Sequence, residues 1–285
     1  MVNIMLEWLM VPLNYEFMQR GLLAAMMVGS ICALIGCYVV LRSMAFLGDA
    51  IAHSVLPGVA IAYLMGANLT IGALAAAIIV ALGVGFLSRQ GAVKEDTAIG
   101  ILFTAALALG VALISSIRSY AVDLSHILFG NLLGVNPTDL WLTAGLGIII
   151  LSTLFLAYKP FLLVTFDPVL AQTLRLKVGF YRTLMIVLLS LTIVVSMQTV
   201  GVGLVAAMLV TPAATAYLLT RRLPVMMAIS STLGALSSLI GLYASYYLNI
   251  ASGSAIVLTA TFFFALAFLF APRKGWVYQF RKHQV

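Results

Sequence analysis

Two ionisable residues lie one helical turn apart in a stretch that is otherwise apolar. Asp49 and His53 occur in "FLGDAIAHSVLPG", residues 46–58, between two long apolar runs. A charged side chain at the centre of a membrane costs about 2.5–3.5 kcal/mol on insertion scales, so it usually faces a bundle interior or a polar path. Residues at i and i+4 share one helix face, and a carboxylate oxygen beside an imidazole nitrogen can bind a divalent metal ion. The spacing therefore predicts metal or proton chemistry, and the alternative is a hydrogen bond within the helix that neutralises both groups.

Two protein ligands hold a transition metal weakly, which suits transport because the cargo must be released. A symmetric dimer would supply a second Asp49 and His53 if this helix face lines the twofold axis. Pro57 and Gly58 follow one turn later. Because proline cannot donate a backbone hydrogen bond to the carbonyl of His53, we expect a free oxygen and a kink at this point.

The other candidate residues have ordinary structural explanations. Capping of helix starts is the expected role of Glu95, Asp96 and Asp139. Asp123 and His126 are expected to form a solvated pair on the outer loop, and the alternative is contact with a metal or a partner protein. Core packing is the expected role of four sulfur-containing residues, Cys32, Cys37, Met44 and Met208, and the alternative for the two methionines is a soft ligand to the metal. No lysine follows a glycine, so the chain has no P-loop and is not expected to hydrolyse ATP.

The composition places these residues in a polytopic, all-α membrane protein. The 285 residues are 64% apolar and only 8% charged, whereas soluble domains carry about 25% charged residues. Since a bilayer core requires about 20 apolar residues per helix, we predict nine transmembrane helices. The predicted spans are 21–41, 44–66, 70–88, 97–117, 140–158, 183–200, 202–220, 223–248 and 253–271. Eight helices are the alternative if 44–66 or the turn at 196–203 behaves differently.

The nine-helix topology puts 13 of the 15 basic residues on one side, with only Arg20 and Arg118 on the other. Such a bias marks the cytoplasmic side, so the net charge of +7 requires no nucleic acid. The C-terminus is then cytoplasmic and the N-terminus outside.

We expect one permease domain over residues 1–285, with two segments that do not span the membrane. The first is an outer loop with a short helix at 118–139. The second is a cytoplasmic helix within 165–180, where Asp167 is the N-cap, Pro168 takes the first helical position and Gly179 is a plausible stop.

Several segments together resemble the permease subunit of bacterial ABC importers for manganese, zinc and iron. They are "LRSMAFLGDAIAHSVLPGVAIAYLMG", "EDTAIGILFTAALALGVAL", "DLSHILFGNLLGV" and "FDPVLAQTLRLKV", which occur here in the family's order. The resemblance implies a homodimeric permease of type II importer architecture. It also implies two separate ATP-binding cassette subunits and an extracytoplasmic metal-binding protein as partners.

The resemblance further assigns residue roles. Asp49 and His53 would contact the transported metal, and Pro57 and Gly58 would form a kink or gate. The coupling helix that engages the ATPase would include Asp167, Pro168, Ala171, Leu174 and Arg175. Pro57 favours manganese as the cargo over iron and zinc, and no permanently bound cofactor is expected.

Other functions remain open on the residues alone. A proton-coupled secondary transporter could use Asp49 and His53 as a proton relay. A passive channel and an intramembrane enzyme are the remaining alternatives, although no nucleophile or third ligand is evident for an enzyme.

Overall fold

The computed structural model describes residues 10–89, 93–116 and 132–271. In these ranges the chain is helical and contains no β-strand. The α-helices are α2 (Glu16–Leu41), α3 (Ala45–Ser54), α4 (Leu56–Leu64), α5 (Leu69–Arg89), α6 (Glu95–Ser115), α8 (Pro137–Leu156), α9 (Tyr158–Phe166), α10 (Pro168–Thr173), α11 (Val178–Val200), α12 (Val202–Leu219), α13 (Leu223–Leu248) and α14 (Ser252–Phe270). A short 3₁₀ helix, η1 (Leu132–Gly134), precedes α8.

Eight helical segments in the described residues are long and apolar enough to cross a membrane, counting α3 and α4 as one. The segment predicted as the seventh span forms α12, whose apolar stretch of Gly203–Leu219 is shorter than the other eight. The predicted division of 183–220 is confirmed, and the break lies at Gly201. This residue has φ 84°, a left-handed conformation that favours glycine because it has no Cβ.

Two helices begin earlier than hydropathy predicted. Helix α2 starts at Glu16 and not at residue 21, and Arg20 pairs with Glu16 at 2.6 Å one turn away. Helix α11 starts at Val178 and not at residue 183, so Arg182 lies within its first turns. A long basic side chain near a helix end can extend its charged group into water. The helices therefore continue through Arg20 and Arg182, although the predicted spans began after these residues.

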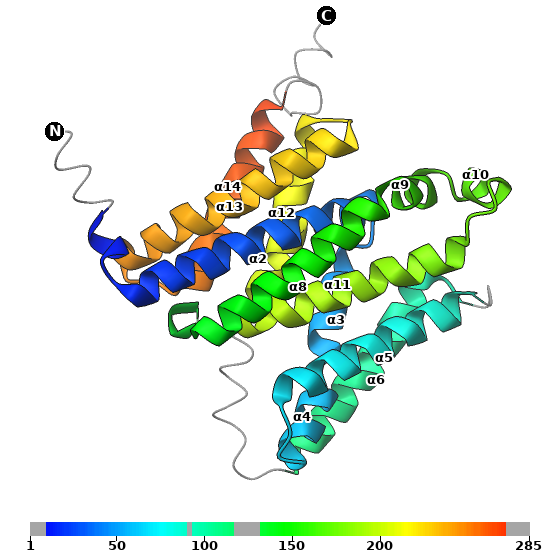
Figure 1. Cartoon of the computed structure of the whole chain (residues 1–285), viewed down its shortest axis with the longest axis horizontal. Helices are drawn as coiled ribbons and strands as arrows, with labels where there is room; N and C mark the ends of the chain where they lie inside the picture. The colour runs from blue at the N-terminus through cyan, green and yellow to red at the C-terminus, as the bar shows by residue number, and fades with distance from the viewer. Residues whose placement is uncertain (1–9, 90–92, 117–131, 272–285) are drawn as a thin grey trace, which may run out of the picture.

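The scaffold of the bundle is the packing of α2 against α12 and α13, which are labelled in Figure 1. Gly29 of α2 meets Gly234 of α13 so closely that an added Cβ would lie 2.8 Å from the Gly234 carbonyl oxygen. The hydroxyls of Ser230 and Ser238 on α13 donate to α2 carbonyls of Ala33 and Ala25, each at 2.9 Å. Lipid tails are as apolar as the helix surface, so the hydrophobic effect does not drive helices together in a membrane. Close packing of small residues and hydrogen bonds from hydroxyl groups join them instead.

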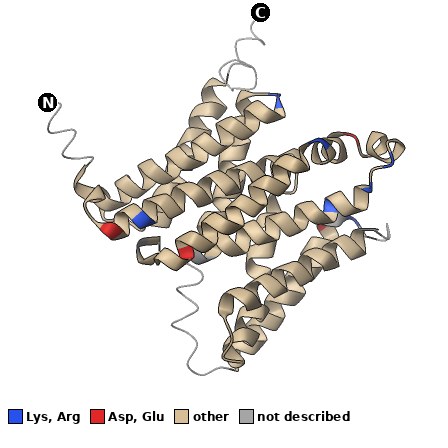
Figure 2. Ribbon diagram, viewed as in Figure 1, with Lys and Arg blue, Asp and Glu red and all other residues tan. Residues whose placement is uncertain are grey.

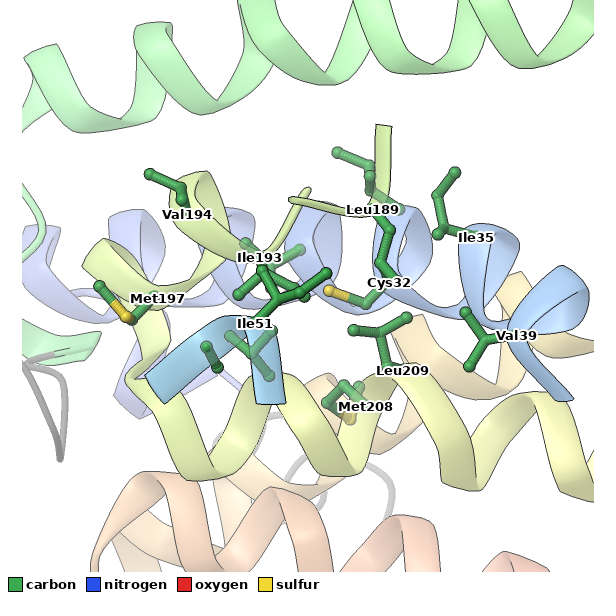
Figure 3. Close-up of a cluster of buried hydrophobic side chains, with 14 of the residues drawn as sticks. Cys32, Ile35, Val39, Ile51, Leu189, Ile193, Val194, Met197, Met208 and Leu209 are labelled. Carbon is green, nitrogen blue, oxygen red and sulfur yellow. The ribbon is translucent and has the colours of Figure 1, made fainter. Parts of the chain in front are cut away.

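The interior at the centre of this scaffold is closely packed and apolar. Figure 3 shows Cys32 of α2, Ile51 of α3, Ile193 of α11 and Met208 of α12 converging on one cluster. Both cysteines are buried free thiols. The predicted packing roles of Cys32 and Met208 are therefore confirmed.

Helices α4, α5 and α6 pack on one another, and α5 packs against α11. In Figure 1 these three helices lie below α11, and α3 crosses steeply between them and the scaffold. An added Cβ at Gly58 of α4 would overlap the carbonyl oxygen of Gly72 on α5, and the reverse also holds. Figure 2 shows most basic residues at the end of the bundle where α9 and α10 protrude, as the predicted charge bias requires.

Candidate metal-transport site

Helix α3 carries the two ionisable residues on the face that points away from the core. Its other face is buried through Leu47, Ala50 and Ile51. The side chain of Asp49 is 43% exposed and that of His53 is 32% exposed. In a single chain, neither residue is sealed inside the bundle or packed deep between neighbouring helices.

The two side chains are neighbours without forming a direct hydrogen bond. Asp49 Oδ1 lies 3.6 Å from His53 Nε2, which is beyond the usual range for a hydrogen bond between nitrogen and oxygen. The two atoms lie within ion-pair distance, so a neutralising contact within the helix stays the alternative to metal binding. The carboxylate oxygen and imidazole nitrogen stand on one side of α3, at a separation that an ion bound to both could bridge.

An aromatic wall borders this pair, and the sequence analysis did not identify it. The ring of Phe103 on α6 lies 6.3 Å from the His53 ring and 5.9 Å from the Phe46 ring, between centroids. One phenylalanine within an apolar span carries no sequence signal, because only the packing of α6 against α3 brings it to His53. The Phe103 ring therefore lies beside the imidazole on one side of the pair.

The helix is interrupted at Val55, two residues after His53. Helix α3 ends at Ser54 and α4 begins at Leu56, with Pro57 in the first turn of α4. The carbonyl of His53, which Pro57 cannot bond, accepts the Val55 N–H. The hydrogen-bond ladder of the helix therefore breaks at Val55, two residues beyond His53, as expected from Pro57, whereas the carbonyl of His53 is not left free as was expected.

Among the described residues, one chain brings two ligands, Asp49 and His53, to the site. Within the described ranges, no three side chains of His, Cys, Asp or Glu come close enough to hold a metal ion. Met208 lies in the buried cluster around Cys32 (Figure 3), so it adds no sulfur ligand to Asp49 and His53. Asp123 and His126 lie outside the described residues.

The predicted caps are largely as expected. Asp139 accepts a hydrogen bond from the backbone N–H of Asn136 at 3.2 Å, closing a capping box at the start of α8. Helix α6 begins at Glu95, so Glu95 and Asp96 lie in its first turn. The carboxylate of Asp96, which is exposed, complements the positive helix end.

The segment predicted as a cytoplasmic helix is shorter than expected. Asp167 caps α10 by accepting the Leu170 N–H at 2.9 Å, and Pro168 is its first residue. The helix ends at Thr173, because Arg175 takes φ 57° and reverses the chain. Gly179 is therefore not the stop but belongs to the first turn of α11.

Only one residue of α10 is buried in the protein. Ala171 is fully buried and packs with Val164 and Val178. Val169 is 69% exposed and Leu174 is 57% exposed. A capped, protruding turn that exposes large apolar side chains is suited to a protein partner.

The comparisons with known proteins agree with one another. The profile described as the ABC 3 transport family matches residues 14–271. The manganese transport system membrane protein MntC of Halalkalibacterium halodurans is 53% identical over 92% of this chain and 90% of its own. The manganese import system permease protein ScaB of Streptococcus parasanguinis is 46% identical over 92% and 93%.

A probable iron transport system membrane protein of Haemophilus influenzae is 42% identical over 94% of this chain and 98% of its own. Among solved structures, PsaBC from Streptococcus pneumoniae in complex with Fab has a TM-score of 0.85 and 41% identity, covering 99% of this chain and all of that one. Since the family profile and these relatives span nearly the whole sequence, this chain belongs to the ABC 3 transport family.

Proposed function

We propose that this protein is the membrane-spanning subunit of an ATP-driven importer that brings a divalent transition metal, with manganese first, into the cytoplasm. Relatives at 53% and 46% identity are named as manganese transport and manganese import proteins. The observation that carries the proposal is the Asp49–His53 pair, half-exposed on one face of an interrupted helix. The pair provides a binding site for the transported metal ion.

Two copies of the chain form the working site. Each protomer contributes one carboxylate and one imidazole, and the half-exposed face of α3 meets its equivalent across a twofold axis. Two Asp49 and two His53 side chains then make a four-ligand set of mixed oxygen and nitrogen. The site exists only between protomers, so separation of the subunits releases the ion.

The four proposed ligands suit manganese, and they could also bind zinc or iron. Carboxylate oxygen favours Mn²⁺, whereas imidazole also suits zinc and iron. A relative named for iron at 42% identity fits this overlap. The break after His53 allows α3 and α4 to change their angle, and Pro57 and Gly58 form the kink at which the path opens.

ATP hydrolysis takes place on two separate cassette subunits, and this chain is not itself catalytic. The coupling segment comprises Asp167, Pro168, Ala171, Leu174 and Arg175, with α10 as its helical part. Its exposed apolar side chains seat in the ATPase, and its movement is passed through α9 and α11 to the bundle. An extracytoplasmic metal-binding protein delivers the ion at the opposite end. The protein resides in the bacterial cytoplasmic membrane with its C-terminus inside.

A proton-coupled transporter was the main alternative from the residues alone. The related proteins described above are named as transport system membrane proteins or permeases, and no observation favours a proton-driven cycle. Uptake that collapses when ATP is depleted while the proton gradient is maintained would separate the two mechanisms.

Uptake of radioactive manganese by cells that express the complete importer tests the proposal. We expect Asp49→Asn and His53→Ala to abolish uptake while the permease still assembles with its ATPase. Asp139→Asn is the matched control, because this residue caps α8 and should leave uptake near the wild-type level. Normal uptake in either site variant would refute the assignment.

A further inference from the structure

A separate pocket of about 350 Å³ opens at one end of the bundle. It lies where helices begin and end: Leu41 is the last residue of α2, Phe166 is the last of α9, and Leu223 is the first of α13. Neither Asp49 nor His53 lines it. The proposed transport path therefore does not account for this pocket.

The walls of the pocket are mainly apolar. Leu223 and Met226 are almost fully buried, with 6% and 2% exposed. At the rim, Phe166 is 59% exposed and Tyr217 is 42% exposed. Tyr217 lies near the end of α12, and tyrosine near the ends of membrane helices is typical of the interface between lipid and water.

The polar part of the pocket is cationic. Arg221 lines it, and in the described part of the chain no carboxylate pairs with its guanidinium. Asp167 follows Phe166 in sequence, but its carboxylate accepts the Leu170 N–H at the start of α10. Thr220 also lines the pocket, and its oxygen accepts the Arg222 N–H at 3.3 Å, so its hydroxyl proton can be donated elsewhere.

We propose that this pocket binds a phospholipid with an anionic headgroup. The guanidinium of Arg221 and the hydroxyl of Thr220 hold the phosphate, since a planar guanidinium donates two parallel hydrogen bonds to phosphate oxygens. The part of the acyl chain nearest the headgroup lies along Leu41 and Phe166. Basic pockets between transmembrane helices bind anionic headgroups in this way, and the pocket volume falls in the range of ordinary ligand sites.

Two rival occupants fit less well. A small soluble anion would contact Arg221 but would leave the apolar walls uncovered. An acidic segment of a protein partner would satisfy the charge but would place backbone groups against those walls without hydrogen bonds. A lipid is the occupant that provides both a phosphate and a chain. Because Phe166 directly precedes the coupling segment, a bound lipid would also support α9 beside it.

The test compares two adjacent arginines. The full importer is purified, exchanged into detergent with equal amounts of phosphatidylglycerol and phosphatidylcholine, and the retained lipid is measured by native mass spectrometry. We expect wild type to retain phosphatidylglycerol preferentially. Arg221→Gln should weaken that retention about fivefold, which is the factor for one basic residue near an anionic surface. Arg222→Gln removes the same charge from outside the pocket and should change retention little.

Each other result would overturn the proposal. Equal losses in the two variants would mean general attraction to the charged end of the protein. Equal retention of the two lipids by wild type would mean no headgroup recognition. Displacement of the lipid by glycerol phosphate at micromolar concentration would identify a soluble-anion site. Retention by the isolated permease that disappears on assembly with the ATPase would mean that a partner segment fills the pocket. Thermal unfolding of both variants checks that they are folded.

Discussion

Replacing Asp167 with alanine tests whether α10 must be folded for the ATPase to engage. The Asp167 carboxylate accepts the Leu170 N–H at 2.9 Å and is the cap of a helix of six residues. Loss of such a cap costs about 1 kcal/mol. A helix this short has no stability of its own in water, and Ala171 is its only buried residue. The free energy lost with the cap therefore destabilises the folded form of α10, which is the form that docks on the ATPase.

A loss of about 1 kcal/mol corresponds to about fivefold weaker binding of the ATPase subunit. We expect this decrease for Asp167→Ala when the ATPase is titrated onto the permease in detergent, with a comparable decrease in manganese uptake at limiting ATPase. The apolar residues that would contact the ATPase are unchanged, so the decrease reports the folding of α10.

Asp167→Asn is the matched control, because asparagine caps helices about as well as aspartate but carries no charge. This variant should bind the ATPase as wild type does. If Asp167→Ala binds normally, the cap does not govern docking. If Asp167→Asn is as weak as Asp167→Ala, the carboxylate acts through its charge on the partner, and the capping argument is refuted.

Three further substitutions follow from the packing. Gly72→Val should lower the thermal stability of the detergent-solubilised protein by at least about 1–3 kcal/mol, because the new side chain overlaps the backbone of α4, whereas Gly145→Ala enters open space and should be neutral. Phe103→Ala should reduce manganese uptake about two- to tenfold without loss of assembly, since an aromatic contact is worth about 0.5–1.5 kcal/mol; unchanged uptake would show that the wall beside His53 is dispensable. Ser230→Ala should destabilise the pairing of α13 with α2 by about 0.6 kcal/mol, measured by thermal unfolding, and a loss of several kcal/mol would contradict the view of a modest interhelical bond.

Local features of this protein could be predicted from the sequence because they depend on neighbours along the chain. Length and hydropathy identified the spanning segments, and the polar, glycine-containing stretch around Gly201 predicted the division between α11 and α12. The caps at Asp139 and Asp167 followed from side-chain chemistry at helix starts. The spacing of Asp49 and His53 was enough to place them on one face of a helix.

Boundaries were less predictable, because basic side chains near helix ends do not interrupt a helix. Arg20 and Arg182 lie within the first turns of α2 and α11, and the predicted spans began after them. The end of α10 was missed for another reason: Arg175 adopts a left-handed backbone conformation, which residue type alone does not predict for arginine.

The sequence by itself determined that this chain is a helical membrane protein with an acid and an imidazole one turn apart in an apolar stretch, since these properties follow from composition and helical periodicity. Only the tertiary structure decided which face of α3 is open, that Phe103 stands beside His53, and that α4 meets α5 through Gly58 and Gly72. The physical reason is that lipid-facing and protein-facing surfaces are both apolar in a membrane protein. Hydrophobic periodicity then says little about which helices meet, and contacts between distant residues appear only when the bundle is packed.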